Sequence, residues 1–173
     1  MNAPLNVSDR VTAEFGGDLA QYMLAVGRAA RRAAADMAAA ATRDRNQVLT
    51  ELARLVRAGS AELVNANALD VQRAKARGLD AALIDRLTLN ATAVEQMAVG
   101  VEQVAQLADP IGEILDVRPQ PSGIKVGRMR VPLGVIGIVY ESRPNVTVDA
   151  ASLTIKSGNA AILRGGSEAI ESN

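Results

Sequence analysis

The stretch 131-VPLGVIGIVYESRPNVTVDAASLTIKSGNAAILRGG-166 decides the fold. Residues 133–139 are apolar apart from Gly134 and Gly137, and residues 160–163 are apolar throughout. Such runs predict strands buried on both faces, as in a parallel sheet. Residues 146–156 have helical spacing, so the order is β-α-β with a right-handed crossover. We expect the two glycines to be close-packing positions, because they lie within the strand and do not form a dinucleotide fingerprint.

A further helix is expected to begin near Ser167, which extends the pattern to β-α-β-α. Two parallel strands do not make a stable open sheet, and this last helix has no stop signal. The fold class is therefore α/β, with residues 132–173 as an incomplete β-α-β-α core. We expect the chain to be a truncated part of a longer protein.

The residues before Pro110 predict helices. The expected helices cover residues 18–41, from 44 to Gly59, 60–76, 81–87 and from 92 to 108. Asp44 with Gln47, and Thr92 with Glu95, are capping-box patterns, and Ser60 is a candidate cap of the third helix.

Within the second helix an apolar stripe should form the buried face; it consists of Val48, Leu49, Leu52, Leu55 and Val56. The charged residues of the helices are expected to form solvated faces rather than binding patches. They include Arg28, Arg31, Arg32, Asp44 and Arg45.

Two short strands are expected at residues 111–117 and 123–131, joined through Pro119, Pro121 and Gly123. We interpret residues 111–131 as a β-hairpin and a candidate oligomerisation element. Residues 1–16 are mixed polar and predict a flexible N-terminus without a signal peptide.

Composition excludes several classes of function. The 173 residues are 49% apolar and 22% charged, which is globular, and 19 basic residues balance 19 acidic ones, which argues against nucleic-acid binding. No apolar run is long enough to span a bilayer, so we expect a cytoplasmic protein without a membrane partner. There is no cysteine and no histidine, so we expect no disulfide and no metal centre. The lack of both residues is also unfavourable for a self-contained catalyst.

The loop from Arg164 through Gly165, Gly166 and Ser167 to Glu168 follows a predicted strand and precedes a predicted helix. A helix N-terminus favours a phosphate, glycines let a ligand approach the backbone, and Arg164 can add a bidentate cationic contact. Glu168 could accept from ribose hydroxyls. The alternative is an ordinary strand-to-helix loop with a serine cap and a surface arginine.

The loop 140-YESRPN-145 follows the other predicted strand, where ligands sit in open α/β sheets. Arg143 could bind a carboxylate or a phosphate. Asn145 could donate to an oxyanion, or could simply cap the following helix. Glu141 could be an acid/base group or merely a polar residue at a strand end.

The segments 131-VPLGVIGIVYESRPNVTVDAA-151 and 156-KSGNAAILRGGSE-168 closely resemble γ-glutamyl phosphate reductase, the glutamate-5-semialdehyde dehydrogenase of proline biosynthesis. The helical half also fits, through Asn67 with Asp70, 78-GL-79, 85-DRL-87 and 109-DPIGE-113. The resemblance implies an aldehyde dehydrogenase-like fold, in which residues 17–110 are the helical part of the nucleotide-binding domain.

The resemblance also implies a function. Its members reduce γ-glutamyl phosphate with NADPH through a cysteine thioester and form a homo-oligomer when full length. Arg164 lies where the superfamily has a lysine that contacts the adenosine ribose, and Gly165, Gly166, Ser167 and Glu168 belong to the same loop. Asn145 is similar to the oxyanion asparagine, and Arg143 is our candidate for the substrate anion.

This chain lacks the catalytic cysteine, so we expect it to be inactive alone. The alternatives are a non-catalytic protein that acts as a helical partner-binding module, and another acylating member of the superfamily.

Overall fold

The computed structural model describes residues 12, 14 and 16–173; the rest of the predicted flexible segment 1–16 lies outside these residues. The elements are α2 (Leu19–Ala39), α3 (Thr42–Ala58), α4 (Ser60–Ala76), α5 (Ala81–Leu87), α6 (Ala91–Gln106), β1 (Ile114–Pro119), β2 (Lys125–Met129), β3 (Val135–Val139), α7 (Asn145–Lys156), β4 (Ala160–Arg164) and the 3₁₀ turn η1 (Ser167–Ala169).

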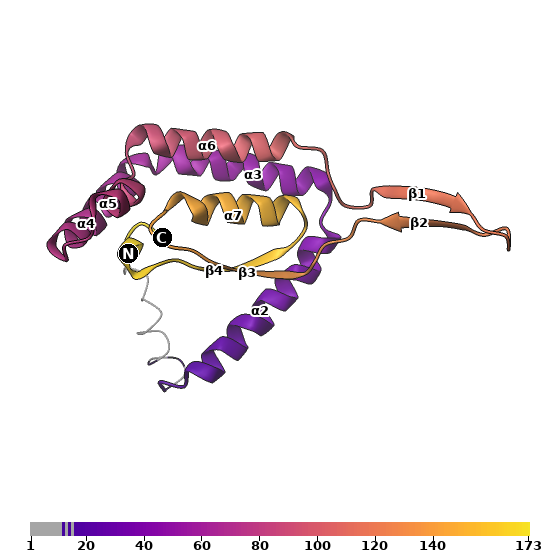
Figure 1. Ribbon diagram of the computed structural model, residues 1–173, viewed down its shortest axis with the longest axis horizontal. Coiled ribbons are helices and arrows are strands. Elements are labelled where there is room, and N and C mark those ends of the chain that lie inside the picture. The colour runs from indigo at the N-terminus through magenta and orange to yellow at the C-terminus, as the bar shows by residue number, and fades with distance from the viewer. Residues whose placement is uncertain (1–11, 13, 15) are drawn as a thin grey trace.

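The elements form layers around the short sheet of β3 and β4 (Figure 1). Helix α7 covers one face and α2 the other, while α3 and α6 pack together above α7. Strands β3 and β4 are parallel, from Val135 opposite Ala160 to Val139 opposite Arg164. The predicted β-α-β unit is therefore confirmed. None of the described helices is long and apolar enough to cross a membrane.

The predicted burial of β3 on both faces is wrong. Leu133 and Val139 are 85% and 74% exposed. The reason is that α2 packs chiefly against β4 and leaves one face of β3 largely uncovered. Close packing does not explain the glycines either, because a Cβ added at Gly134 or Gly137 would meet nothing within 4 Å. Gly134 instead has a φ of +106°, which other residues rarely adopt.

The main core lies between α3 and α6 and reaches α7. Its buried members are Leu49, Ala53, Val56, Leu89, Val94, Met97, Ala98 and Val101. The predicted stripe on α3 is thus only partly right, because Val48 and Leu55 are each 52% exposed. The face turned towards α6 is the one that carries Leu49, Ala53 and Val56.

The capping predictions are wrong by one to three positions. Helix α3 begins at Thr42, so Asp44 lies in its first turn, where a carboxylate still complements the helix dipole. Asn90, not Thr92, caps α6 by accepting from the N–H of Ala93 at 2.8 Å. Ser60 is the first residue of α4 and makes no capping bond.

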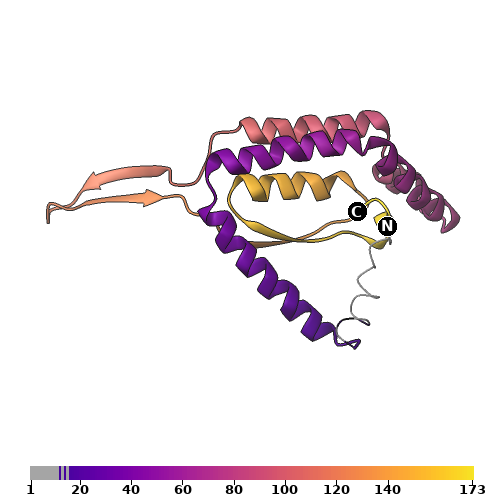
Figure 2. The ribbon, with the colours of Figure 1, turned by 180° about the vertical axis from the view of Figure 1, so that it is seen from behind.

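The predicted hairpin is confirmed, with β1 and β2 antiparallel and both strands exposed along their length. It projects away from the layered body as an arm, which is clear when the molecule is seen from behind (Figure 2). The first strand begins and ends later than the predicted 111–117, because residues 111–113 connect the arm to the body, and the second is shorter than the predicted 123–131.

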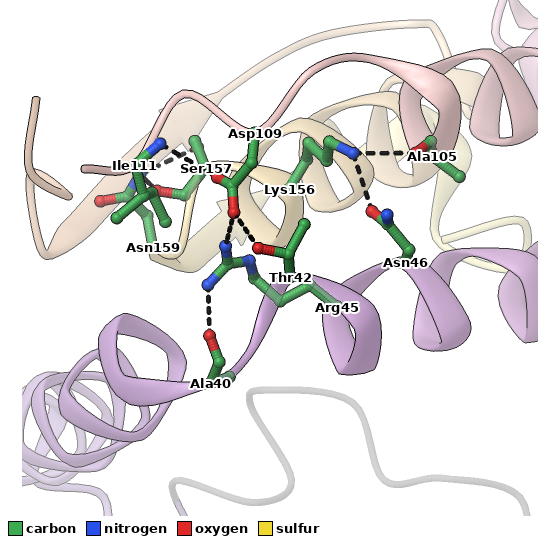
Figure 3. A network of polar contacts seen from close by, with 10 residues as sticks. All are labelled: Ala40, Thr42, Arg45, Asn46, Ala105, Asp109, Ile111, Lys156, Ser157 and Asn159. Atoms are coloured by element: carbon green, nitrogen blue, oxygen red, sulfur yellow. Dashed lines mark hydrogen bonds and ion pairs between the residues drawn. The ribbon is translucent and has the colours of Figure 1, made fainter. Parts of the chain in front are cut away.

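The prediction that Arg45 lies on a solvated face of its helix is wrong. Arg45 is 4% exposed, its Nη2 lies 2.5 Å from Oδ2 of Asp109, and its Nη1 donates to the carbonyl of Ala40 (Figure 3). Asp109 also accepts from the hydroxyl of Thr42 and, at 3.0 Å, from the N–H of Ile111. Helical spacing places Arg45 on the buried side of Leu49. The ion pair therefore ties the start of α3 to the base of the arm.

A second buried cation, Lys156, lies in the same region at the end of α7 (Figure 3). Its ammonium donates to Oδ1 of Asn46 at 2.7 Å and to the carbonyl of Ala105 at 2.8 Å. Burial lowers the pKa of Lys156, against the opposing effect of the Asp109 charge. These bonds hold the end of α7 against α3 and α6.

The turn between α7 and β4 locks the amino ends of the two strands together. Asn159 is 4% exposed; its Oδ1 accepts from the N–H of Gly134 at 2.8 Å. The carbonyl of Gly134 then accepts from Ala160 at 2.9 Å. Gly158 has a φ of +69°, and a Cβ there would lie 2.5 Å from Cδ1 of Ile111 and 3.1 Å from Cγ of Pro132.

We predict that Gly158→Ala lowers the free energy of unfolding by about 2–4 kcal/mol, because it adds both backbone strain and a clash with Ile111. Urea unfolding followed by circular dichroism measures the change. Gly100→Ala is the matched control: Gly100 lies within α6 and its added Cβ would meet nothing within 4 Å. That variant should be more stable by about 0.5–1 kcal/mol. Equal effects of the two changes would contradict this account of the turn.

We also predict that Asp109→Ala destabilises the chain by about 3 kcal/mol, because it leaves the buried Arg45 charge without its partner. The comparison is with Glu51→Ala, which breaks an ion pair with Arg54 whose side chains are 53% and 62% exposed. Exposed pairs contribute little, so the urea midpoint of that variant should not move measurably. A similar loss in both variants would show that the burial of Arg45 is unimportant.

Candidate functional site

The parallel pairing brings both predicted loops to one edge of the sheet. Residues 140–145 follow β3 and residues 165–168 follow β4, and the N–H of Tyr140 donates to the carbonyl of Arg164 at 3.1 Å. The arm lies at the opposite end of these strands (Figure 1). The candidate site is therefore the carboxyl edge of β3 and β4, where open α/β sheets bind ligands.

Glu168 joins the two loops directly. Its Oε1 accepts from the N–H of Ser142 at 2.6 Å and from the hydroxyl of Ser142 at 2.9 Å. Burial would raise the pKa of Glu168, but bonds from its own N–H and from Ser142, with the charge of Arg164, together hold that pKa below its ordinary value. The carboxylate is thus ionised at neutral pH and acts only as an acceptor.

Ser142 holds a strained position. It is 6% exposed and has a φ of +48°, one of two positive values among the described non-glycine residues. Such conformations persist where the surroundings fix them, and they gather at functional sites. The two bonds to Glu168 are the contacts that fix Ser142.

The glycine loop is built differently from the expectation. The helix predicted near Ser167 is a single 3₁₀ turn with Gly166 at its N-cap, and the serine makes no capping bond. The side chains of Asn173 and Glu168 lie where a Cβ of Gly165 and of Gly166 would be. The glycines therefore admit the chain's own side chains to the backbone. A phosphate here would depend on Arg164, which is exposed, more than on a helix N-terminus.

The residues after β3 lie at the start of α7. Pro144 is the N-cap, so the capping role considered for Asn145 is excluded; the amide of Asn145 donates to Oδ2 of Asp149 at 2.9 Å instead. Arg143 and Glu141 are exposed, and Arg143 forms no ion pair with the described residues. Both charged side chains are open to a ligand.

Two buried polar residues of α4 anchor the end of the chain beside the site. Asp70, 1% exposed, accepts from the N–H groups of Glu171 and Ser172 and from the hydroxyl of Ser172. Asn67 bonds to the same hydroxyl and to the backbone of Leu87 and Leu89. The sequence alone gives Asn67 and Asp70 no role. Their spacing is the available signal: Asn67, Asp70 and Ala74 lie three and four positions apart, so they share one face of α4. Polar side chains on a buried face need hydrogen-bond partners inside the protein.

An apolar groove of about 560 Å³ runs between α2 and β4. It is lined by Tyr22, Met23, Val26 and alanines of α2 and by residues 160–164. It meets the carboxyl edge only at Arg164, so its lining offers little to a phosphate.

Several solved structures match the chain over most of its length. γ-Glutamyl phosphate reductase from Thermotoga maritima is similar at a TM-score of 0.82 with 41% identity, over 87% of this chain and 36% of that one. The Saccharomyces cerevisiae γ-glutamyl phosphate reductase gives 0.79 and 33%, over 83% of this chain and 36% of that one. The predicted resemblance to γ-glutamyl phosphate reductase is confirmed.

The chain spans about a third of the length of these reductases. A putative aldehyde dehydrogenase from Bacillus subtilis is similar at a TM-score of 0.64 with 18% identity, over 83% of this chain and 29% of that one. This third match shows the aldehyde dehydrogenase-like fold, as predicted. No protein-family model matches the chain.

The Ser142–Glu168 contact should be sensitive to acid. A carboxyl group whose pKa is lowered on folding stabilises the fold fully above its unfolded pKa, and loses that contribution as the pH falls through the folded value. We expect the amide resonance of Ser142 to titrate with a midpoint below 4.5, the ordinary pKa of a glutamate. Two-dimensional NMR of the chain measures this midpoint. In Glu168→Gln the transition should vanish; its survival would show that Ser142 reports another carboxyl group.

Proposed function

We propose that this chain is the N-terminal part of an NADPH-dependent reductase that converts γ-glutamyl phosphate to glutamate 5-semialdehyde and phosphate in proline biosynthesis. The observation that carries the proposal is the match to two γ-glutamyl phosphate reductases, at 41% and 33% identity. The meeting of two charged loops at the ligand-binding edge of the sheet supports it. The enzyme would work in the cytoplasm, as expected of amino-acid biosynthesis.

The cofactor role falls to the loop after β4. Ionised Glu168 suits the ribose hydroxyls, which are donors, and the guanidinium of Arg164 suits a phosphate. Gly165, Gly166 and Ser167 shape the turn between them. These residues fit the adenosine side of NADPH, and the bound cofactor would supply the hydride.

The substrate role falls to the loop after β3. Exposed Arg143 can pair with an anionic group of γ-glutamyl phosphate. The amide of Asn145 retains a second N–H beside the bond to Asp149, so it can still donate to a developing oxyanion.

The chain has no cysteine, so it cannot form a thioester and should be inactive alone.

The arm is proposed as an oligomerisation element of the full-length enzyme. Its apolar side chains are exposed beyond what a monomer needs, with Ile114 and Met129 at 59% and Ile124 at 61%. Exposed apolar surface of this kind marks interaction sites.

The test of the function is an assay of the full-length protein that carries this chain. It should reduce NADP in the presence of glutamate 5-semialdehyde only when phosphate is added, and the 173-residue chain should not. Absence of phosphate-dependent activity would overturn the proposal. It would favour the non-catalytic partner-binding alternative, whereas activity with simple acyl donors alone would favour another acylating dehydrogenase.

Within that enzyme, we predict that Arg164→Ala raises the KM for NADPH about tenfold, because a charge-assisted bond to phosphate is lost. The KM for NADH should change much less. Arg143→Ala is the matched control, since it removes the equivalent exposed arginine after β3. It should raise the KM for γ-glutamyl phosphate and leave that for NADPH unchanged. Equal increases in the KM for NADPH and for NADH in Arg164→Ala would exclude Arg164 as a contact of the 2′-phosphate.

A further inference from the structure

Ser142 has no role in the function proposed above, yet it is the best-buried polar residue of the loop after β3. Both of its donors, the N–H and the hydroxyl, point at a single oxygen, Oε1 of Glu168. Two donors on one oxygen leave a carboxylate little freedom to rotate. Ser142 therefore sets the direction in which the second oxygen, Oε2, faces.

The position of Glu168 depends on Gly166 as well. The Glu168 carboxylate folds back over Gly166 into the space that any Cβ there would occupy. One arrangement thus has three parts: the positive φ of Ser142, the absence of a side chain at Gly166, and the Glu168 side chain that folds back over Gly166. Strain is maintained only where neighbouring contacts fix it, and these contacts do so across two loops.

The second oxygen, Oε2, is the one that Ser142 leaves unbound. Oε2 accepts no hydrogen bond from another residue in the described part of the chain, and the carboxylate lies within the field of Arg164. An acceptor-only oxygen and a guanidinium that belong to the same loop are complementary to a group that carries a hydroxyl next to a phosphate. The ribose of a 2′-phosphorylated adenosine has this chemistry.

We propose that Ser142 is a positioning residue of the cofactor site: it holds Oε1 of Glu168 inside the protein so that Oε2 faces a ribose hydroxyl of the cofactor's adenosine. The inference rests on the proposed function for the identity of the ligand. The role of Ser142 is separate, because it is argued from its contacts with Glu168.

The test uses the 173-residue chain and adenosine 2′,5′-bisphosphate, followed by NMR shifts of the Gly165 and Gly166 amides at millimolar concentrations. Ser142→Gly keeps the N–H and accepts the positive φ, so it removes the hydroxyl, together with its methylene, without adding backbone strain. Loss of one hydrogen bond to the charged Glu168 carboxylate should raise the dissociation constant of adenosine 2′,5′-bisphosphate about tenfold. The Glu168 side-chain carbon should also titrate at a higher pH, closer to the ordinary glutamate value, which general destabilisation would not produce.

The matched control is Ser152→Ala. Ser152 is a buried serine of α7, 1% exposed, whose hydroxyl donates to the carbonyl of Asp149 and does not contact Glu168. It should bind the probe as the unaltered chain does. When Glu168→Gln is already present, adding Ser142→Gly should not weaken binding of the probe any further, because both changes act on one contact.

The outcomes separate the two proposals. No shift in the unaltered chain overturns the cofactor assignment of these loops, and the inference with it. Binding that Ser142→Gly leaves unchanged overturns the role of Ser142 alone. Equal weakening by Ser142→Gly and Ser152→Ala, or full additivity with Glu168→Gln, also overturns it, since Ser142 would then not act through Glu168.

Discussion

The parallel pairing of β3 with β4 is the constraint on which the rest of the molecule depends. Because the strands run in the same direction and in register, the loops that follow them emerge side by side. Residues 142 and 168 are 26 positions apart in the chain, yet they form two hydrogen bonds. The pairing is itself fixed at its start, where Asn159 bonds to Gly134 and no side chain fits at Gly158.

The amino ends of the same strands carry a different kind of chemistry. The cations Arg45 and Lys156 are buried there, and their partners are Asp109, the side chain of Asn46 and backbone carbonyls. Breaking such a pair is costly because the remaining charge has no water to solvate it. The network joins the start of α3 and the ends of α6 and α7 to the base of the arm.

The sequence was sufficient for the architecture because its periodicities are local. The apolar runs, the helical spacing and the hairpin all predict elements that the structure contains. It was insufficient for burial, because exposure depends on which face a neighbouring helix covers, as Val48, Val139 and Arg45 show. The capping predictions were wrong for a related reason. Asp44 and Thr92 fit the capping pattern, but α3 begins two residues before Asp44 and α6 begins one residue before Thr92.

For the candidate site, the sequence located both loops but not their internal contacts. Arg164, Glu168, Arg143 and Asn145 are recognisable by residue type and by position after a strand. Ser142 is not, because its role depends on a positive φ and on a carboxylate from the other loop, neither of which leaves a local pattern.

The two ends of strands β3 and β4 differ in their polar contacts, and the shared direction of the strands is the physical reason. At the amino ends, the buried cations Arg45 and Lys156 are paired with a carboxylate, an amide and backbone carbonyls, so these contacts contribute to stability. At the carboxyl edge, by contrast, Arg143 and Arg164 are exposed, and Oε2 of Glu168 accepts no hydrogen bond from another described residue. Exposed charged side chains next to a strained loop are the arrangement expected of a binding edge. The same two strands thus separate what holds this chain together from what can recognise a ligand.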